Sequence, residues 1–300
     1  MSEVSYNIFC PAKINLFLEV TGRRPDGYHE LATLFAKLKF GDNISLTLTP
    51  NTKTEINVTL TGPYAGVITA GPDNLVYKAA QRFFEYANIT AKCDITLDKQ
   101  VPTGAGLGGG SSDAGCLLRT LCNHYKIDFK NIIPLAAKLG ADVPLFLYDE
   151  AVLKGEGIGD KLTPVKVAGA MPHVVLSYPN VHIPTKNVFA GLSLPKEEEV
   201  LTSVVKLDKI IFALSEGKQI SAWKDLIYNR LEEVVFPAQR EVLDLKVFMN
   251  TQAAPAAMMS GSGSTVFALF DLEQDAVKLT MELKNRGSVV FLTQLWEGLK

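Results

Sequence analysis

Residues 101 to 115, VPTGAGLGGGSSDAG, combine closely spaced glycines with hydroxyl side chains. Glycines let backbone N–H groups converge without obstruction by side chains, and the segment leads into an apolar stretch with helical periodicity. A helix N-terminus carries unpaired N–H groups and the positive end of the helix dipole, to which Ser111 and Ser112 would add hydroxyl donors. The segment therefore predicts a cradle for a polyphosphate.

Other interpretations of this loop are open from the residues alone. A spacing of the type G-x-G-x-x-G, found in dinucleotide-binding loops, is present at Gly104, Gly106 and Gly109. Asp128 follows at about the 20-residue offset of a ribose-binding acid, but Pro102 interrupts the strand exit that this motif needs. The GK[ST] of a Walker A loop and the HRD and DFG elements of protein kinases are absent from the sequence. A flexible loop or a glycine-packed helix entry is the structural alternative.

Composition limits the classes of function. The 300 residues are 47% hydrophobic and 21% charged, which is ample for a buried core and favours two domains. The net charge of -2 comes with no basic stripe, so neither a nucleic-acid nor a membrane partner is expected. The N-terminus has no charged region followed by an apolar run, and no stretch approaches the roughly 18 apolar residues of a membrane span. We expect a cytoplasmic protein.

Four cysteines occur at spacings that fit neither a zinc site nor a disulfide framework, namely Cys10, Cys93, Cys116 and Cys122. Free thiols that behave as small buried hydrophobes are therefore expected. The segment YHELA lacks the second histidine of a zinc-protease helix, because Thr33 stands in its place. We expect no dedicated metal site.

Hydrophobic periodicity predicts the elements of the first half. An alternation with period two indicates strands over residues 6–20, 43–49, 55–61 and 93–99, with turn signals at Asp26-Gly27 and Gly41-Asp42. Apolar positions three or four apart indicate helices over residues 74–87, 114–125 and 132–140, with Asp73 as the N-cap of the first.

The composition of the sequence changes near Leu162, where proline and glycine become frequent. We place a domain boundary there and expect domains over residues 1–160 and 161–300. The second half shows a strand, several helices up to about residue 250, a pair of strands, a helix and a last strand. The patterns cover residues 173–178, 255–261, 265–270, 273–286 and 288–294. This order predicts an α+β fold rather than a doubly wound sheet.

Three segments resemble motifs of the GHMP kinase superfamily, the small-molecule kinases for galactose, homoserine, mevalonate and phosphomevalonate. PTGAGLGGGSSDA, residues 102–114, is similar to its phosphate-binding motif. Residues 11–31 and 259–270 are similar to its N-terminal and C-terminal motifs. The resemblance implies an N-terminal ATP-binding domain like domain 2 of ribosomal protein S5, a C-terminal ferredoxin-like α/β sandwich, and a site in the cleft between them. It also implies that ATP and Mg²⁺ are used.

Within the superfamily, AKINLFL, GYHEL, GLGGGSSDA and LGADVPLFL resemble one branch most closely. The implied reaction is phosphorylation of the 2-hydroxyl of cytidine diphosphate methylerythritol, in the non-mevalonate route to isoprenoid precursors. The implied partner is this small molecule, and the chain would be a monomer or a homodimer. A kinase for another alcohol, a nucleotide sensor that transfers no phosphate, and an NAD-dependent dehydrogenase are the alternatives.

The resemblance also assigns roles to residues. Asp142, in the segment GADVP, maps onto the general base, and Lys13, in PAKIN, maps beside it. Without the resemblance, Lys13 would be interpreted as a snorkelling strand residue and Asp142 as a turn cap. Asn15 lies two residues after Lys13, so on a strand both side chains share one face. The resemblance implies that Asn15 and Asp142 contact the substrate.

Further residues are assigned to the cofactor and the substrate. The aromatic ring of Tyr28 would stack on the cytidine, to which His29 would hydrogen bond, and Thr185 and Phe189 would close over the same substrate. Asn74 maps near the adenine, and whether Glu156 holds magnesium is left open. The nucleotide-binding loop would comprise Pro102, Gly104, Gly106, Leu107, Gly108, Gly109, Gly110, Ser111 and Ser112.

Overall fold

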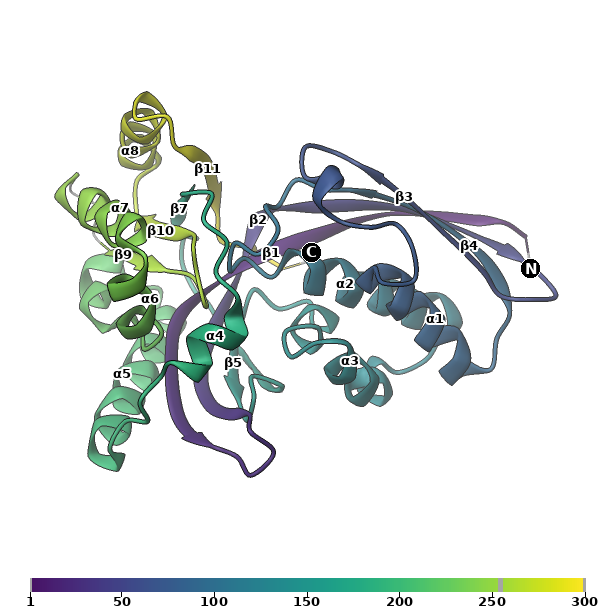
Figure 1. Ribbon diagram of the computed structural model, residues 1–300, viewed down its shortest axis with the longest axis horizontal. Helices are drawn as coiled ribbons and strands as arrows, with labels where there is room; N and C mark the ends of the chain where they lie inside the picture. Colours follow the sequence, from purple (N-terminus) through teal and green to yellow (C-terminus); the bar gives the residue numbers. More distant parts are fainter. Residues whose placement is uncertain (1, 253–255, 299–300) are drawn as a thin grey trace. The chain divides into compact units, whose positions relative to one another are not determined.

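The computed structural model describes residues 2–252 and 256–298, and its elements are numbered along the chain in Figure 1. By contacts between residues, the chain divides into two compact units. Unit 1 contains residues 2–12, 41–103 and 108–149, and unit 2 contains residues 13–40, 104–107, 150–252 and 256–298. The predicted domain boundary at residue 160 stays a prediction, because these units are defined by contacts and are discontinuous along the chain.

Unit 1 is built on strands that the alternation of apolar and polar residues predicted. Strands β1 (Val4–Arg23) and β2 (His29–Pro50) are long and contribute residues to both units. In unit 1, β4 (Ala91–Asp98) pairs antiparallel with β2, with Leu97 opposite Ile44, and β3 (Glu55–Thr61) pairs parallel with β4. Every second residue of β4 is buried, from Ala91 to Leu97, so one face of the sheet forms the core.

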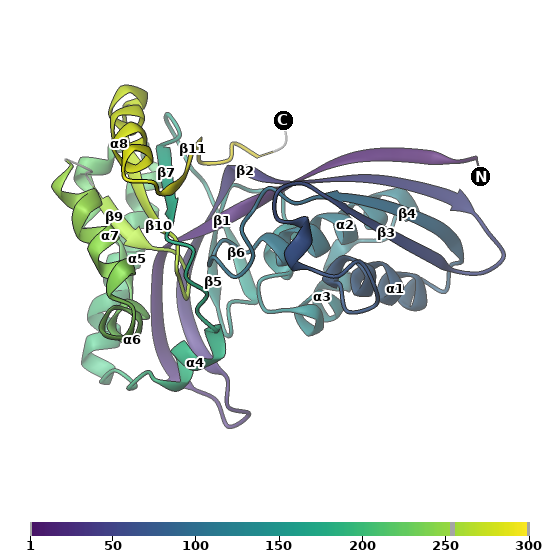
Figure 2. The ribbon, with the colours of Figure 1, turned by 45° about the horizontal axis from the view of Figure 1, so that its top comes forward.

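Helices cover that buried face. Figures 1 and 2 show α1 (Leu75–Ala87), α2 (Gly109–Tyr125) and α3 (Ile133–Leu139) on the same side of the sheet of unit 1. Helix α1 buries Phe83 and Phe84, and α2 buries Leu117 and Leu121. Three short 3-10 helices complete the unit: η1 (Ala65–Val67), η2 (Phe129–Ile132) and η3 (Pro144–Leu147).

Unit 2 contains two sets of paired strands. In the first set, β8 (Tyr228–Asn229) runs parallel to β1, β5 (Val152–Glu156) runs antiparallel to β2, and β6 (Lys161–Val165) pairs with β5. The second set is an antiparallel sheet in the order β11 (Val289–Gln294), β7 (His173–Tyr178), β10 (Val266–Phe270) and β9 (Ala256–Met259). The predicted second-half strands are thereby confirmed, although residue 255 lies outside the described residues.

The helices of unit 2 are α4 (Thr185–Ala190), α5 (Glu197–Ser215), α6 (Glu232–Ala238), α7 (Arg240–Thr251) and α8 (Glu273–Asn285), with 3-10 helices η4 (Ile220–Ala222) and η5 (Lys224–Leu226). Helices α7 and α8 lie on one face of the four-stranded sheet (Figures 1 and 2). The core between them includes Val175, Met249, Ala268 and Leu279. The α+β class agrees with the sequence prediction, and the described strands form two sheets.

The predicted turn at Gly41-Asp42 is wrong, because β2 continues through both residues. Strand β1 approaches so closely here that a Cβ at Gly41 would lie 2.1 Å from the carbonyl oxygen of Cys10. Asp42 is fully buried and accepts hydrogen bonds from neighbouring backbone and side-chain groups. Both residue types therefore serve close packing and polar contacts rather than a turn.

Two helix starts also differ from the predictions. Asn74, not Asp73, caps α1, since its Oδ1 accepts a hydrogen bond of 2.9 Å from the backbone N–H of Val76. Asp73 is exposed and pairs with Lys78 instead. Helix α2 begins at Gly109, five positions before the apolar pattern that predicted it at Ala114. Propensity disfavours glycine in a helix, which explains the late prediction.

Candidate active site

The start of α2 has the form expected for an anion cradle. Gly108 is the N-cap, in the left-handed conformation with φ +69°, and its carbonyl oxygen accepts the N–H of Ser112 at 2.8 Å. No side chain caps the helix and no acidic residue lies in its first turn. The first N–H groups of a helix have no partner within it and attract anions. The hydroxyl of the buried Ser112 donates to the carbonyl of Pro11 at 2.7 Å, so it secures the helix to β1.

The preceding part of the glycine loop, residues 104–107, belongs to unit 2 and packs on a second glycine segment, residues 260–264. Ser260 Oγ donates to the carbonyl of Gly106 at 3.0 Å, and the N–H of Thr265 donates to the carbonyl of Ala105 at 3.2 Å. A Cβ at Gly106 would lie 2.2 Å from the carbonyl oxygen of Ser260, and Gly106 has φ +78°. Only glycine fits this position without strain.

Lys13 and Asn15 lie side by side on β1, as their spacing predicts. Lys13 Nζ donates to Asn15 Oδ1 at 2.8 Å, and Asn15 Nδ2 donates to Thr33 Oγ1 at 2.9 Å. The Thr33 hydroxyl donates in turn to the carbonyl of Phe17 at 2.7 Å. Lys13 and Asn15 are only 4% and 2% exposed. A buried ammonium held in a hydrogen-bonded row is suited to stabilising negative charge on a small anionic group.

The second glycine segment lies against this row. A Cβ at Gly261 would approach Lys13 Nζ to 3.1 Å and Asn15 Oδ1 to 3.4 Å. Asn229, on β8, donates both Nδ2 hydrogens, to the carbonyls of Met259 and Gly261, each at 2.8 Å. Its Oδ1 accepts the N–H of Leu231 at 3.0 Å. Asn229 therefore fixes the second glycine segment beside Lys13, a role that no sequence pattern had indicated.

Two of the residues predicted to contact the substrate, His29 and Phe189, meet in unit 2. The rings of His29 and Phe189 stack, with centroids 5.3 Å apart and an interplanar angle of 30°. Burial, together with the nearby Arg23, lowers the pKa of His29, which favours the neutral imidazole. Tyr28 precedes His29 at the end of the turn between β1 and β2, and the residue is 60% exposed. The position of Tyr28 leaves its ring accessible to a ligand.

Thr185 lies at the start of α4, and its Oγ1 is 2.7 Å from the hydroxyl of Ser262 in the second glycine segment. Phe189 lies on the same helix. The structure thus brings Thr185 to the glycine segment and Phe189 to His29. Both predicted substrate residues of α4 contact elements of the candidate site.

The remaining predicted residues lie in unit 1 or outside these contacts. Asn74 uses its side chain within the protein, because Nδ2 also donates to the carbonyl of Thr69 at 2.6 Å. Asp142 is half-buried in the turn between α3 and η3. Lys13 belongs to unit 2 and Asp142 to unit 1, so their pairing stays a prediction. In the loop, Pro102 and Leu107 are buried, whereas Gly110 is exposed.

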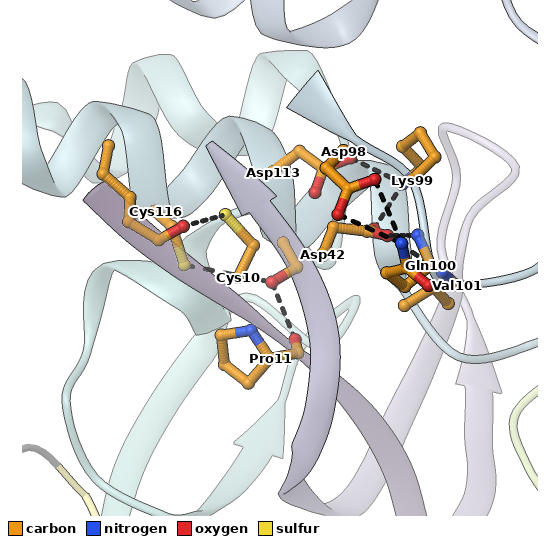
Figure 3. Close-up of polar contacts among 11 residues, drawn as sticks. Cys10, Pro11, Asp42, Asp98, Lys99, Gln100, Val101, Asp113 and Cys116 are labelled. Atoms are coloured by element: carbon orange, nitrogen blue, oxygen red, sulfur yellow. Dashed lines mark hydrogen bonds and ion pairs between the residues drawn. The ribbon is translucent and has the colours of Figure 1, made fainter. Parts of the chain in front are cut away.

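Sequence reasoning missed a buried ionic cluster in unit 1, formed by Asp42, Lys99 and Asp113 (Figure 3). The three residues are distant in the sequence, so no local pattern connects them. The only sign of the cluster in the sequence is that these charged residues stand beside otherwise apolar strand and helix positions.

The candidate site contains little that could hold a metal ion by itself. Among residues 2–252 and 256–298, no group of three or more His, Cys, Asp and Glu side chains could bind one. Glu156 is exposed and pairs with Lys154 at 3.4 Å. All four cysteines are buried, as predicted, and none of these four forms a disulfide.

In the part of the chain that the structure describes, no helix combines the length and apolar character needed to cross a membrane.

Comparison with known proteins identifies the class. The model of the GHMP kinases N terminal domain matches residues 74–150, and that of the GHMP kinases C terminal domain matches residues 211–289. The chain belongs to the GHMP kinases, which are ATP-dependent kinases of small molecules. The fold of a homoserine kinase from Cytophaga hutchinsonii is similar as well, with a TM-score of 0.76 at 18% identity, covering 98% of this chain and 96% of that one.

Within this class, several relatives of one kind share more than 30% of their aligned residues with this chain. A 4-diphosphocytidyl-2-C-methyl-D-erythritol kinase from Burkholderia multivorans is 36% identical over 273 residues, 90% of this chain and 87% of that protein. The kinase of the same name from Citrifermentans bemidjiense is 33% identical over 283 residues, 93% and 95% of the two chains. A crystal structure of 4-(cytidine 5'-diphospho)-2C-methyl-D-erythritol kinase has a TM-score of 0.76 at 31% identity, covering 98% of this chain and 100% of that one.

Proposed function

We propose that this protein transfers the γ-phosphate of ATP to the 2-hydroxyl of 4-diphosphocytidyl-2-C-methyl-D-erythritol, in the non-mevalonate route to isoprenoid precursors. Similarity above 30% identity to kinases of that name over about nine-tenths of the chain supports the substrate. The observation that best supports phosphoryl transfer is the buried chain of hydrogen bonds from Lys13 to Asn15 to Thr33, beside the second glycine segment. We further propose a cytoplasmic location and leave the choice between monomer and homodimer as a prediction.

Phosphoryl transfer asks a protein mainly for positioning and for positive charge around the transferred group. In this proposal, the N–H groups at the start of α2 bind the phosphates of ATP, with the hydroxyl of Ser111 beside them. Lys13 stabilises negative charge on the attacking oxygen, and its hydrogen bond to Asn15 fixes its direction. Asp142 accepts the proton of the substrate hydroxyl.

Magnesium would arrive with the nucleotide. The described residues offer no cluster of acidic ligands, so phosphate oxygens and water would supply most of the coordination. Ser111, half-buried near the start of α2, provides a hard oxygen that fits such an ion. When bound, the metal offsets the phosphate charge as that charge redistributes.

The cytidine end of the substrate would be recognised in unit 2. The aromatic rings of Tyr28 and Phe189 provide faces on which a base can stack, and neutral His29 can both donate and accept a hydrogen bond. The hydroxyl groups of Thr185 and Ser262, which hydrogen bond to each other, would contact the same substrate. Relatives that act on smaller alcohols have no base to recognise.

A coupled assay of ADP release tests the proposal. The purified protein would be given Mg-ATP with 4-diphosphocytidyl-2-C-methyl-D-erythritol, mevalonate or homoserine in parallel. We expect turnover with the cytidyl alcohol alone. Turnover with another alcohol would contradict the substrate, and ATP binding without any turnover would favour a nucleotide sensor. NAD binding in place of ATP would revive the dehydrogenase alternative.

A further inference from the structure

The ionic cluster of unit 1 connects three separate pieces of chain. Lys99 follows β4 and donates from Nζ to Asp42 of β2 and to Asp113 of α2, the latter at 2.7 Å (Figure 3). The other oxygen of Asp42, Oδ1, accepts the backbone N–H groups of Gln100 and Val101 at 2.6 and 2.8 Å. One carboxylate and one ammonium therefore fasten the chain that enters the glycine loop.

The same cluster fastens the chain that leaves the loop. Asp113 lies in the second turn of α2, four residues after Gly109. A Cβ at Gly109 would lie 3.1 Å from the side chain of Val101 and 3.3 Å from Asp42 Oδ2. The first residue of α2 thus lies close to the strand exit and to the cluster, and a Cβ there would fit only if its neighbours moved by a few tenths of an ångström. Both ends of the glycine loop meet at Asp42.

The cluster is costly as a means of stability alone. The side chains of Asp42, Lys99 and Asp113 are at most 4% exposed, and replacement of buried ion pairs by apolar residues is often neutral or stabilising. Asp113 Oδ1 has no hydrogen-bond partner among the described residues. A buried ion pair does, however, fix positions. The hydrogen bonds of a lysine are directional, so one lysine can hold two carboxylates at defined places.

We propose that Asp42, Lys99 and Asp113 form a positioning cluster that sets the spacing between the two ends of the glycine loop, and thereby the affinity of the loop for the phosphates of ATP. The proposal rests on the proposed function, in which the start of α2 binds these phosphates. Asp113 is a positioning residue, since it acts through the helix that carries the phosphate-binding N–H groups.

Steady-state kinetics of three variants test the proposal, after turnover and ATP binding of the wild-type protein have been established. Asp113→Ala removes the contact with Lys99 and should raise the KM for ATP by about tenfold or more, as misplacement of binding groups does. The KM for the cytidyl alcohol should stay within about twofold of the wild-type value. Asp113→Asn keeps an oxygen that accepts from Lys99 and should restore the KM for ATP.

Leu121→Ala is the matched control, because Leu121 is fully buried on the same helix but near its other end. It should lower the melting temperature without changing the KM for ATP. Equal changes of this KM in Asp113→Ala and Leu121→Ala, or an unchanged KM in Asp113→Ala, would overturn the proposal. If Asp113→Ala does not fold, Asp113→Ser replaces it, with the same expected and contrary outcomes. Absence of ATP turnover in the wild-type protein would refute the proposed function instead.

Discussion

At the scale of single residues, the most specific prediction concerns Asp142, the proposed general base. Asp142→Asn should reduce turnover by at least ~10²-fold, because the amide cannot accept the proton of the substrate hydroxyl. ATP binding should be almost unchanged, which calorimetry would measure beside the kinetic assay. Asp149→Asn is the control, since Asp149 is an exposed acid of the same unit and pairs with Arg119. Undiminished turnover in Asp142→Asn would remove this residue from the mechanism.

Asp113 should impose a pH dependence on stability. Its pKa is raised in the folded protein, mainly by burial, so the folded state holds a proton that the unfolded state releases above a pKa of about 3.9. Stability from this residue is therefore largest below that pH and is lost as the pH rises toward the folded-state pKa.

Urea unfolding of wild type and Asp113→Asn between pH 4 and pH 8 would isolate this contribution, because the other titrating groups are common to both proteins. The stability of wild type relative to Asp113→Asn should fall with rising pH over this range. A difference that is constant or that grows in favour of wild type would show that Asp113 is ionised throughout.

At the scale of elements, the parts predicted correctly are those with a regular hydrophobic period. Strand β4 was predicted over most of its range, because its alternately buried residues, from Ala91 to Leu97, leave a period of two in the sequence. Helix α2 was predicted from Ala114 onward, where its apolar face begins, and its glycine-rich first turn was missed. Gly41 and Asp42 were mistaken for a turn, since their partners Cys10 and Lys99 are far away in the sequence.

The site was foreseen to the extent that its residues lie in contiguous motifs. Lys13 and Asn15 share a strand face, and their contact follows from a spacing of two. Asn229 could not be predicted in this way, because its partners are backbone carbonyls 30 and 32 residues further along the chain. Contacts of this kind depend on the pairing of β8 with β1, which local propensity does not determine.

Asn229 should affect turnover indirectly, because it holds the second glycine segment in position beside Lys13. Asn229→Asp keeps an acceptor for the N–H of Leu231 but places a carboxylate oxygen opposite the carbonyls of Met259 and Gly261. Loss of these buried donors should cost about 1–3 kcal/mol of unfolding free energy. Turnover should fall by about tenfold or more, because the second glycine segment shifts beside Lys13.

Chemical denaturation and the ADP-release assay would measure the two effects. Tyr228→Phe, one residue earlier on the same strand, is the control, since it removes only an exposed hydrogen bond of 3.3 Å to Glu233. It should leave both quantities nearly unchanged. Full activity in Asn229→Asp would show that the second glycine segment keeps its position without Asn229.

At the scale of the whole molecule, the helix start predicted to bind phosphates and the residues predicted to contact the cytidyl end belong to different units, although residues 104–107 of the nucleotide-binding loop belong to unit 2. The start of α2 and Asp142 belong to unit 1, whereas Lys13, His29, Thr185 and Phe189 belong to unit 2. Strands β1 and β2 contribute to both, so each unit depends on the same long strands. The division predicts that binding of the cytidyl alcohol and binding of ATP can be altered separately.

Phe189→Ala tests this separation from the substrate side. Removal of the ring that stacks on His29 should weaken binding of the cytidyl alcohol by about 1–3 kcal/mol, if a base stacks there. This corresponds to a KM raised by roughly 5 to 150-fold, while the KM for ATP should not change. Phe212→Ala, which removes an exposed ring of α5 in the same unit, should alter neither constant. An effect of Phe189→Ala on the KM for ATP alone would place the cytidine elsewhere, because a base held in unit 2 has to depend on the ring that faces His29.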